Sequence, residues 1–366
     1  MIGPILVLDT KNVWIREPFK ALGARMPTMG LGPELHAWHW LANPKAVPQV
    51  GWSQHKIFLP SHALGRFSHW MSPLTGLAIR RVCPNPGAVV LTFPNQWGIL
   101  SGLRCPWAIY YASDDFSTAY GWSSDHVRTW ESRIVTKVQR VIVVSKALAE
   151  RFEMLYHMPR DRILIVPNGV PEAAIPQQFS SIPLPSPQPV PSTFRPLAGV
   201  LGTFSSRLHI AWLRQAVETL PWLHWVFVGP VENIHPEDQV DFIYLQSHPR
   251  CCFTGYIPYE RLFDFAASFD VALIPFKNEG INPASSPVRL FCQLPFGQPI
   301  LATPGCRQLE EFEPWVTMCR TPVQLTETLV SLAARQFDDG LRAARFGESK
   351  FHTWEKRGEK LAEMFA

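Results

Sequence analysis

The chain has 366 residues, of which 46% are apolar and 17% are charged. This length exceeds the size at which one hydrophobic core usually stops growing, so two domains are expected. The 34 basic residues outnumber the 30 acidic ones by only four, and the surplus is dispersed, which argues against nucleic acid as a partner. The 14 Trp and 23 Phe residues mainly suit cores, although an interfacial role leaves peripheral membrane association open.

The seven cysteines are odd in number, contain no C-x-x-C pair and lie mostly in apolar segments. This pattern favours free thiols in a reducing compartment over disulfides or zinc ligands. The N-terminus lacks the basic region of a signal peptide, and no apolar run approaches the roughly 20 residues of a membrane span. We therefore expect a cytoplasmic protein, with peripheral attachment to the inner membrane face left open.

Short apolar runs alternate with helix-length amphipathic segments, which predicts parallel sheets with crossover helices. Val127, Trp130, Ile134 and Val138 share one face of a predicted helix, and Ser145 is a candidate helix N-cap. The strands predicted in the first half are 5–8, 57–59, 89–93, 108–111, 141–144 and 163–166. Those predicted in the second half are 197–201, 224–228, 251–254, 271–274, 300–303 and 316–319.

A proline-rich tract separates the two halves. Residues 171–196 carry eight prolines, favour polyproline II and cannot supply donors to a sheet ladder, so we interpret them as an interdomain linker. The predicted domains are 1–170 and 197–350, and the helix at 351–366 is expected to pack back on the first domain. Two such domains would face a central cleft at the carboxyl ends of their sheets.

Several motifs are absent. The chain has no G-x-G-x-x-G after the first strand, no G-x-x-x-x-G-K-[ST], no G-x-S-x-G and no H-E-x-x-H. Dinucleotide-dependent oxidoreductases, P-loop proteins, hydrolases with a nucleophile elbow and zinc proteases each lose their strongest sequence cue.

The most informative segment is 270–303. A predicted strand leads into a polar loop, and Ser286 and Pro287 are expected to be the N-cap and first residue of a helix that ends near Gly297. A helix N-terminus offers unpaired N–H groups and a positive dipole end, which suit a diphosphate, and Arg289 adds further donors. From the residues alone, an ordinary capped helix with a surface arginine is an equally weighted interpretation.

This segment resembles the donor-binding signature of GT-B glycosyltransferases, especially bacterial members related to family 4. The matching residues are Phe276, Ser286, Pro287, Arg289, Leu290, Phe291, Gly297, Pro299, Ala302 and Thr303. Collinear matches occur at 143–145, 166–170, 202–204, 228–230, 253–256 and 352–357. The resemblance covers roughly residues 85 to 360, and the order of its elements makes it specific.

The resemblance implies an α/β protein with two Rossmann-like domains (GT-B), the first on the acceptor side and the second binding a nucleotide sugar. It implies metal-independent sugar transfer to a glycan or lipid-linked acceptor in polysaccharide biosynthesis. No cofactor is expected, because the nucleotide sugar is a substrate, and a UDP-sugar is favoured over a GDP-sugar. The donor-binding residues are expected to be Gly202, Thr203, Arg207, Tyr256, Glu279, Asn282, Ser285, Ser286 and Arg289.

The sequence departs from the family at one position. Many family 4 enzymes carry two glutamates eight residues apart, the second of which binds the donor ribose; here Cys292 occupies the matching helical position. A thiol is a poor ribose acceptor. Either Glu279 or Asn282 takes the role, or donor affinity is reduced, or activity is lost. A catalytically silent nucleotide-sugar-binding protein and a nucleotide-sugar epimerase therefore stay open as alternatives.

Two aspartates follow the predicted strand 108–111. Asp114 and Asp115 resemble the Tyr-x-x-x-Asp-Asp-Phe element of a bacterial polysaccharide-type subset of the family. Adjacent carboxylates at a strand end can position an acceptor hydroxyl and remove its proton, so both are candidate catalytic residues, with Asp114 preferred. The alternative is a turn or capping pair on a solvated loop. A metal site is disfavoured because adjacent side chains diverge.

Overall fold

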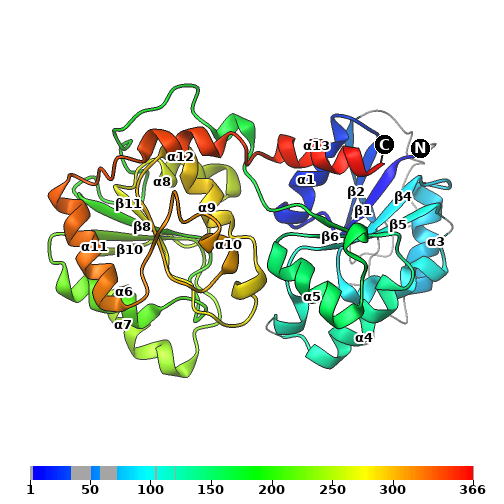
Figure 1. The fold of residues 1–366 in the computed structure, drawn as a ribbon, viewed down its shortest axis with the longest axis horizontal. Coiled ribbons are helices and arrows are strands. Elements are labelled where there is room, and N and C mark those ends of the chain that lie inside the picture. The colour runs from blue at the N-terminus through cyan, green and yellow to red at the C-terminus, as the bar shows by residue number, and fades with distance from the viewer. Residues whose placement is uncertain (1–2, 34–50, 58–71, 104, 120, 366) are drawn as a thin grey trace. The chain divides into compact units, whose positions relative to one another are not determined.

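The computed structural model describes residues 3–33, 51–57, 72–103, 105–119 and 121–365. The chain forms two compact units (Figure 1). The first unit combines Met1–Asn168, Ala284–Ser286 and Trp354–Ala366, and the second combines Gly169–Pro283 and Pro287–Thr353. Each unit has its own buried apolar core and its own fully parallel sheet. The predicted α/β class with two Rossmann-like sheets is confirmed.

The sheet of the first unit has seven strands in the order β3-β2-β1-β4-β5-β6-β7. They are β1 (Ile5–Leu8), β2 (Thr28–Pro33), β3 (Trp52–Ile57), β4 (Ala88–Leu91), β5 (Trp107–Ala112), β6 (Arg140–Val143) and β7 (Ile163–Ile165). Strands β1 and β4 are buried at every position, because helices cover both faces of a parallel sheet. The predicted strand 57–59 lies outside the described residues except for Ile57, the last residue of β3.

Five α-helices surround this sheet within the described part of the first unit, with short 3₁₀ turns between them. They are α1 (Val13–Gly23), α3 (Ser72–Val82), α4 (Ser124–Val135), α5 (Lys146–Tyr156) and α13 (Trp354–Phe365). Helix α5 begins after Ser145, whose Oγ accepts a hydrogen bond from the N–H of Leu148 at 3.1 Å, as the predicted N-cap requires.

The C-terminal helix α13 lies beside α1 in the first unit (Figure 1). Gly358 makes this close approach feasible, since a Cβ at this position would lie 2.7 Å from the backbone carbon of Ala21. Leu361 and Phe365 of α13 join the apolar core of the first unit. The last helix is therefore part of that unit's core.

The sheet of the second unit has six strands in the order β10-β9-β8-β11-β12-β13. They are β8 (Leu197–Leu201), β9 (His224–Val228), β10 (Cys251–Phe253), β11 (Val271–Ile274), β12 (Ile300–Ala302) and β13 (Thr317–Met318). The helices of this unit are α6 (Ile210–Thr219), α7 (Gln239–Ser247), α8 (Leu262–Ala266), α9 (Val288–Gln293), α10 (Arg307–Glu310), α11 (Pro322–Ala334) and α12 (Arg342–Ser349).

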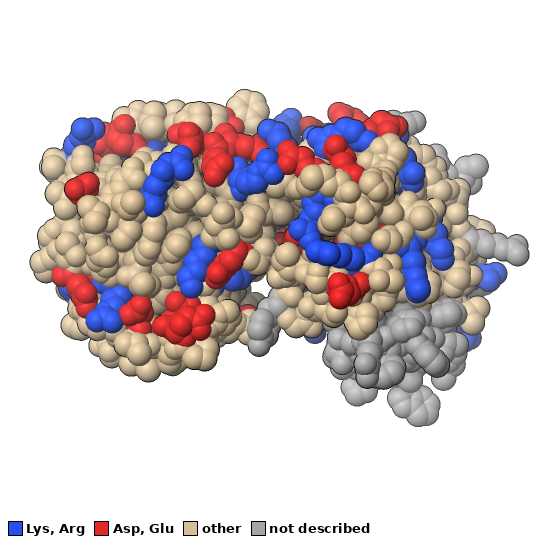
Figure 2. Space-filling view, turned by 60° about the horizontal axis from the view of Figure 1, so that its bottom comes forward, with Lys and Arg blue, Asp and Glu red and all other residues tan. Residues whose placement is uncertain are grey.

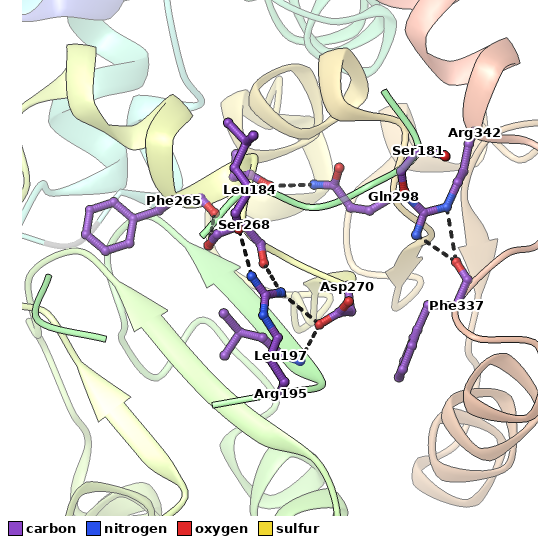
Figure 3. A network of polar contacts seen from close by, with 11 residues as sticks. Ser181, Leu184, Arg195, Leu197, Phe265, Ser268, Asp270, Gln298, Phe337 and Arg342 are labelled. Carbon is purple, nitrogen blue, oxygen red and sulfur yellow. Dashed lines mark hydrogen bonds and ion pairs between the residues drawn. The ribbon is translucent and has the colours of Figure 1, made fainter. Parts of the chain in front are cut away.

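The proline-rich tract 171–196 lies within the second unit. Figure 3 shows how arginine side chains fasten it. The guanidinium of Arg195 donates to the backbone oxygens of Leu184 and Ser268, each at 2.7 Å, and pairs with Asp270 at 3.1 Å. Arg342 of α12 donates to the backbone oxygen of Ser181 at 2.6 Å. Because prolines lack N–H groups, the tract cannot pair as a strand, and side chains of the same unit fix it instead.

Charged side chains of both signs are interspersed over the surface. On the face shown in Figure 2, Lys and Arg side chains lie beside Asp and Glu side chains on both units. In the described residues, no helix combines the length and apolar character needed to cross a bilayer.

We expect Arg195→Ala to lower the free energy of unfolding of the second unit by about 1.5 to 3 kcal/mol, the range for hydrogen bonds to a charged group. Urea unfolding followed by tryptophan fluorescence measures this. The control is Arg320→Ala in the same unit, where the pair with Glu313 spans 3.7 Å and both side chains are more than half exposed. Such a pair contributes at most about 1 kcal/mol. Equal losses in the two variants would contradict the assigned role of Arg195.

Candidate functional site

The second sheet changes its strand order between β8 and β11, which are hydrogen-bonded neighbours. Ligands of open parallel sheets bind beyond the carboxyl ends of the strands at such a reversal. The loop after β8 begins at Gly202, and the loop after β11 begins at Pro275. These loops and helix α9 form the candidate site of the second unit.

Arg289 projects from α9 toward the loop after β8. Its Nη2 donates to the backbone oxygen of Thr203 at 2.7 Å. Gly202 has a φ of +84°, and a Cβ at this position would lie 3.1 Å from Nε of Arg289. Any other amino acid at position 202 would have a strained backbone, and its side chain would crowd the guanidinium. Glycine therefore leaves room for the side chain of Arg289.

The guanidinium of Arg289 has no counter-charge among the residues that the structure describes. It forms no ion pair with a described residue, and its Nη1 is buried without a hydrogen-bond partner. Its carbon lies 4.9 Å from the centre of the Phe276 ring. Burial, together with the nearby charge of Arg207, lowers the pKa of Arg289 to about 9. Since burying an unpaired charge is costly, an anion bound here would be stabilised strongly.

Arg207 is the second cation of this site, and it lies 5.7 Å from the same Phe276 ring. Its Nε donates to Oδ1 of Asn282 at 2.9 Å, while Nδ2 of Asn282 donates to the backbone oxygens of Arg207 and Lys277 at 3.0 and 2.8 Å. Asn282 is fully buried. It therefore ties the two loops together and keeps Arg207 close to Arg289.

The remaining predicted donor residues of this unit lie apart from the arginine pair. Tyr256 is 76% exposed, and the side chain of Glu279 is 53% exposed, 3.9 Å from Nζ of Lys277. No hydrogen bond joins either side chain to Arg289. The structure brings Gly202, Thr203, Arg207, Asn282 and Arg289 together and leaves Tyr256 and Glu279 exposed.

Cys292 is a buried, neutral thiol. Its exposed fraction is 1%, and burial raises its pKa to about 12. It carries neither the charge nor the accepting strength of a glutamate.

Ser285 and Ser286 belong to the first unit. Oγ of Ser286 accepts from the N–H of Asn168 at 2.9 Å, and Nδ2 of Asn168 donates to the backbone oxygen of Ser286 at 2.7 Å. The N-cap of α9 is Pro287, not Ser286, and the helix has only six residues. The predicted N-cap was one residue too early, because the Ser286 hydroxyl pairs with Asn168 instead of the helix.

The aspartates after β5 occupy different environments in the first unit. Asp115 is buried, and its Oδ1 accepts from the N–H and the hydroxyl of Ser117 at 3.2 and 2.8 Å. Its Oδ2 pairs with Nη1 of Arg151 at 2.9 Å. Asp114 is half-buried, and its negative charge, after burial, contributes to the raised pKa of Tyr111. Asp115 thus serves as an N-cap and as an ion-pair partner.

A second buried carboxyl group, that of Glu131, lies beside β5. Glu131 of α4 accepts hydrogen bonds from the hydroxyls of Tyr110 at 2.8 Å and Tyr156 at 2.5 Å. The pKa of Glu131 is raised to about 7, mainly by burial. The hydrogen bonds from the two tyrosines and the charge of Arg151 act to lower this pKa, whereas the charge of Asp115 acts to raise it. The carboxyl thus exchanges its proton near neutrality.

Arg151 and Glu131 carry no local signal in the sequence. Their partners lie 21 to 36 residues away along the chain, on other elements. No local spacing signals such contacts. Among the described residues, no group of three or more His, Cys, Asp or Glu side chains is placed to hold a metal ion.

The chain is similar to known glycosyltransferases. A family model described as Glycosyltransferase Family 4 matches residues 44–173. HepE from Anabaena, in complex with UDP and glucose, has a TM-score of 0.72 at 12% identity, with 99% of each chain covered. A glycosyltransferase from Rickettsia africae has a TM-score of 0.69 at 13% identity, covering 99% of this chain and 97% of that one.

The lipopolysaccharide outer core galactosyltransferase WaaB, in its apo form, has a TM-score of 0.60 at 11% identity, with 100% of each chain covered. No curated protein matches the chain in sequence. At these identities the solved structures establish the fold, which is the GT-B fold of two Rossmann-like domains. Together with the family model, they confirm the predicted resemblance to family 4 glycosyltransferases.

We expect Glu131→Gln to change how stability depends on pH. Unfolded glutamate releases its proton near pH 4.5, whereas folded Glu131 keeps it to about pH 7. Between these values unfolding releases a proton, so rising pH destabilises the wild type relative to the variant, by about 3 kcal/mol over the whole window. Urea unfolding of both proteins at pH 5 and pH 8 measures this. Parallel pH profiles would show that Glu131 ionises normally.

Proposed function

We propose that the protein is a glycosyltransferase that moves a sugar from a nucleotide sugar, with a UDP-sugar favoured, to a glycan or lipid-linked acceptor. The observation that carries the proposal is the buried guanidinium of Arg289, which has no counter-charge in the described part of the chain and lies beside Arg207 where the second sheet reverses its strand order. HepE, which shares the fold, is described in complex with UDP and with UDP-glucose. WaaB acts on lipopolysaccharide by its description, which supports the acceptor class.

The two arginines suit a diphosphate for electrostatic reasons. In sugar transfer the bond from the anomeric carbon to the diphosphate breaks, the acceptor oxygen bonds to that carbon, and negative charge grows on the departing nucleoside diphosphate. Fixed cations stabilise that charge more in the transition state than in the ground state. Arg207 and Arg289 would provide the charge that a metal ion supplies in other enzymes, so we propose a metal-independent reaction.

We propose Asp114 as the residue that accepts the proton of the acceptor hydroxyl. It is half-buried after the carboxyl end of β5, next to Asp115, which is buried and bound by Ser117 and Arg151. A positioned carboxylate can remove a proton as the new bond forms. A location in the cytoplasm, with peripheral attachment at the inner membrane face, would fit polysaccharide biosynthesis.

A second candidate function is a catalytically silent protein that binds nucleotide sugars. The observation that favours it is the buried neutral thiol of Cys292 at the position of the ribose-binding glutamate. Release of UDP from a UDP-sugar distinguishes the two, because a silent protein binds the donor without turnover. An epimerase would convert the donor without an acceptor.

We expect Arg289→Met to weaken UDP binding by about 1.5 to 3 kcal/mol, which is roughly a 10- to 150-fold rise in Kd, because a charge-assisted contact to phosphate is lost. Titration calorimetry with UDP measures this. The control is Arg335→Met, an exposed arginine at the end of α11, which should bind UDP as the wild type does. Unchanged affinity in Arg289→Met would remove the arginine from the donor site.

We expect Asp114→Asn to lower turnover by about 100- to 10,000-fold while UDP affinity stays within twofold, because only the proton acceptor is lost. Asp115→Asn should instead lower the free energy of unfolding by about 1 to 3 kcal/mol, because it breaks a partly buried ion pair. Kinetics with a UDP-sugar and urea unfolding separate the two effects. Full turnover in both Asn variants would contradict a catalytic aspartate here.

A further inference from the structure

The turn that follows Asp114 is held by hydrogen bonds to the adjacent Asp115. Asp115 is the N-cap of the 3₁₀ turn Phe116–Thr118, and its Oδ1 accepts two hydrogen bonds from Ser117. Its side chain is 6% exposed, so water does not replace these donors. The position of Asp114 therefore depends on how firmly Asp115 is fixed.

Arg151 of α5 contacts the turn after Asp114 at two points. Its Nη1 pairs with Oδ2 of Asp115 at 2.9 Å, and its Nη2 donates to the hydroxyl of Ser117. The planar fork of a guanidinium fits two acceptors at once and restricts their orientation, which a single ammonium group does not do. The side chain of Arg151, from another element, thus holds Asp115 and Ser117 in one orientation.

The helix that supplies Arg151 is itself anchored to β5. Tyr156 at the end of α5 and Tyr110 in β5 both donate to Glu131 of α4. The other end of α5 is capped by Ser145. Glu131 therefore links the strand before the turn to the helix that clamps the turn.

We propose that Arg151 is a positioning residue for the reaction, acting through Asp115 and Ser117 to hold Asp114 in its working place. This inference rests on the proposed function, in which Asp114 accepts the proton. Arg151 also neutralises the carboxylate adjacent to Asp114, so its loss would leave two like charges side by side. Arg151 lies in the first unit, whereas the proposed diphosphate-binding residues Arg207 and Arg289 lie in the second, so we expect its loss to leave the donor KM nearly unchanged.

The test compares Arg151→Met with Arg151→Lys. For UDP-sugar turnover we expect kcat to fall about 10- to 100-fold in Arg151→Met, the cost of a misplacement of about 1 Å, with the donor KM within about twofold. Arg151→Lys restores the charge without the fork and should recover part of kcat. The control is Arg160→Met, which removes an exposed pair with Glu153 of the same helix and should keep wild-type kcat.

Hydrogen exchange gives a readout that needs no substrate. The N–H groups of Ser117 and Thr118 bond to Oδ1 and the backbone oxygen of Asp115. They should exchange about tenfold faster or more in Arg151→Met and at the wild-type rate in Arg160→Met. Wild-type kcat in Arg151→Met, or unchanged exchange at these two amides, overturns the inference. If the wild type turns over no UDP-sugar, the proposed function fails instead, and exchange alone decides whether Arg151 holds the turn.

Discussion

The reversal of strand order between β8 and β11 is the constraint on which the proposed donor site depends. It brings the loop at Gly202 and the loop at Phe276 to one edge of the second sheet, although they are far apart in sequence. Helix α9 then adds Arg289 to that edge. The result is two neighbouring guanidinium groups, and that of Arg289 pairs with no carboxylate of the described residues. A diphosphate is the ligand class that this imbalance fits.

The first unit has the same architecture. Its sheet also reverses, between β1 and β4, and β5 ends next to that point. Two adjacent aspartates follow β5, and the buried one, Asp115, is bound by Ser117 and Arg151. Residue type alone could not make this distinction, since both carboxylates have the same intrinsic chemistry.

Continuous apolar runs made the central strands predictable, and β1, β8, β9 and β11 have the predicted bounds. Strand β2 (Thr28–Pro33) was missed, because two glycines and a proline in six residues are typical of a turn. In the site, family resemblance identified Arg289, but not its missing counter-charge. The contacts of Asn282, Asp115 and Glu131 join separate elements of the fold. Only the folded chain therefore shows that Asn282 links two loops and that Arg151 holds Asp115.

We propose that Arg289 and Arg207 bind the diphosphate of a nucleotide sugar. A crystal structure of the protein with UDP tests this binding most directly. We expect diphosphate oxygens within hydrogen-bond distance of the Arg289 guanidinium, beside the loop at Gly202. UDP bound elsewhere, with the Arg289 guanidinium still lacking an anion, would contradict it.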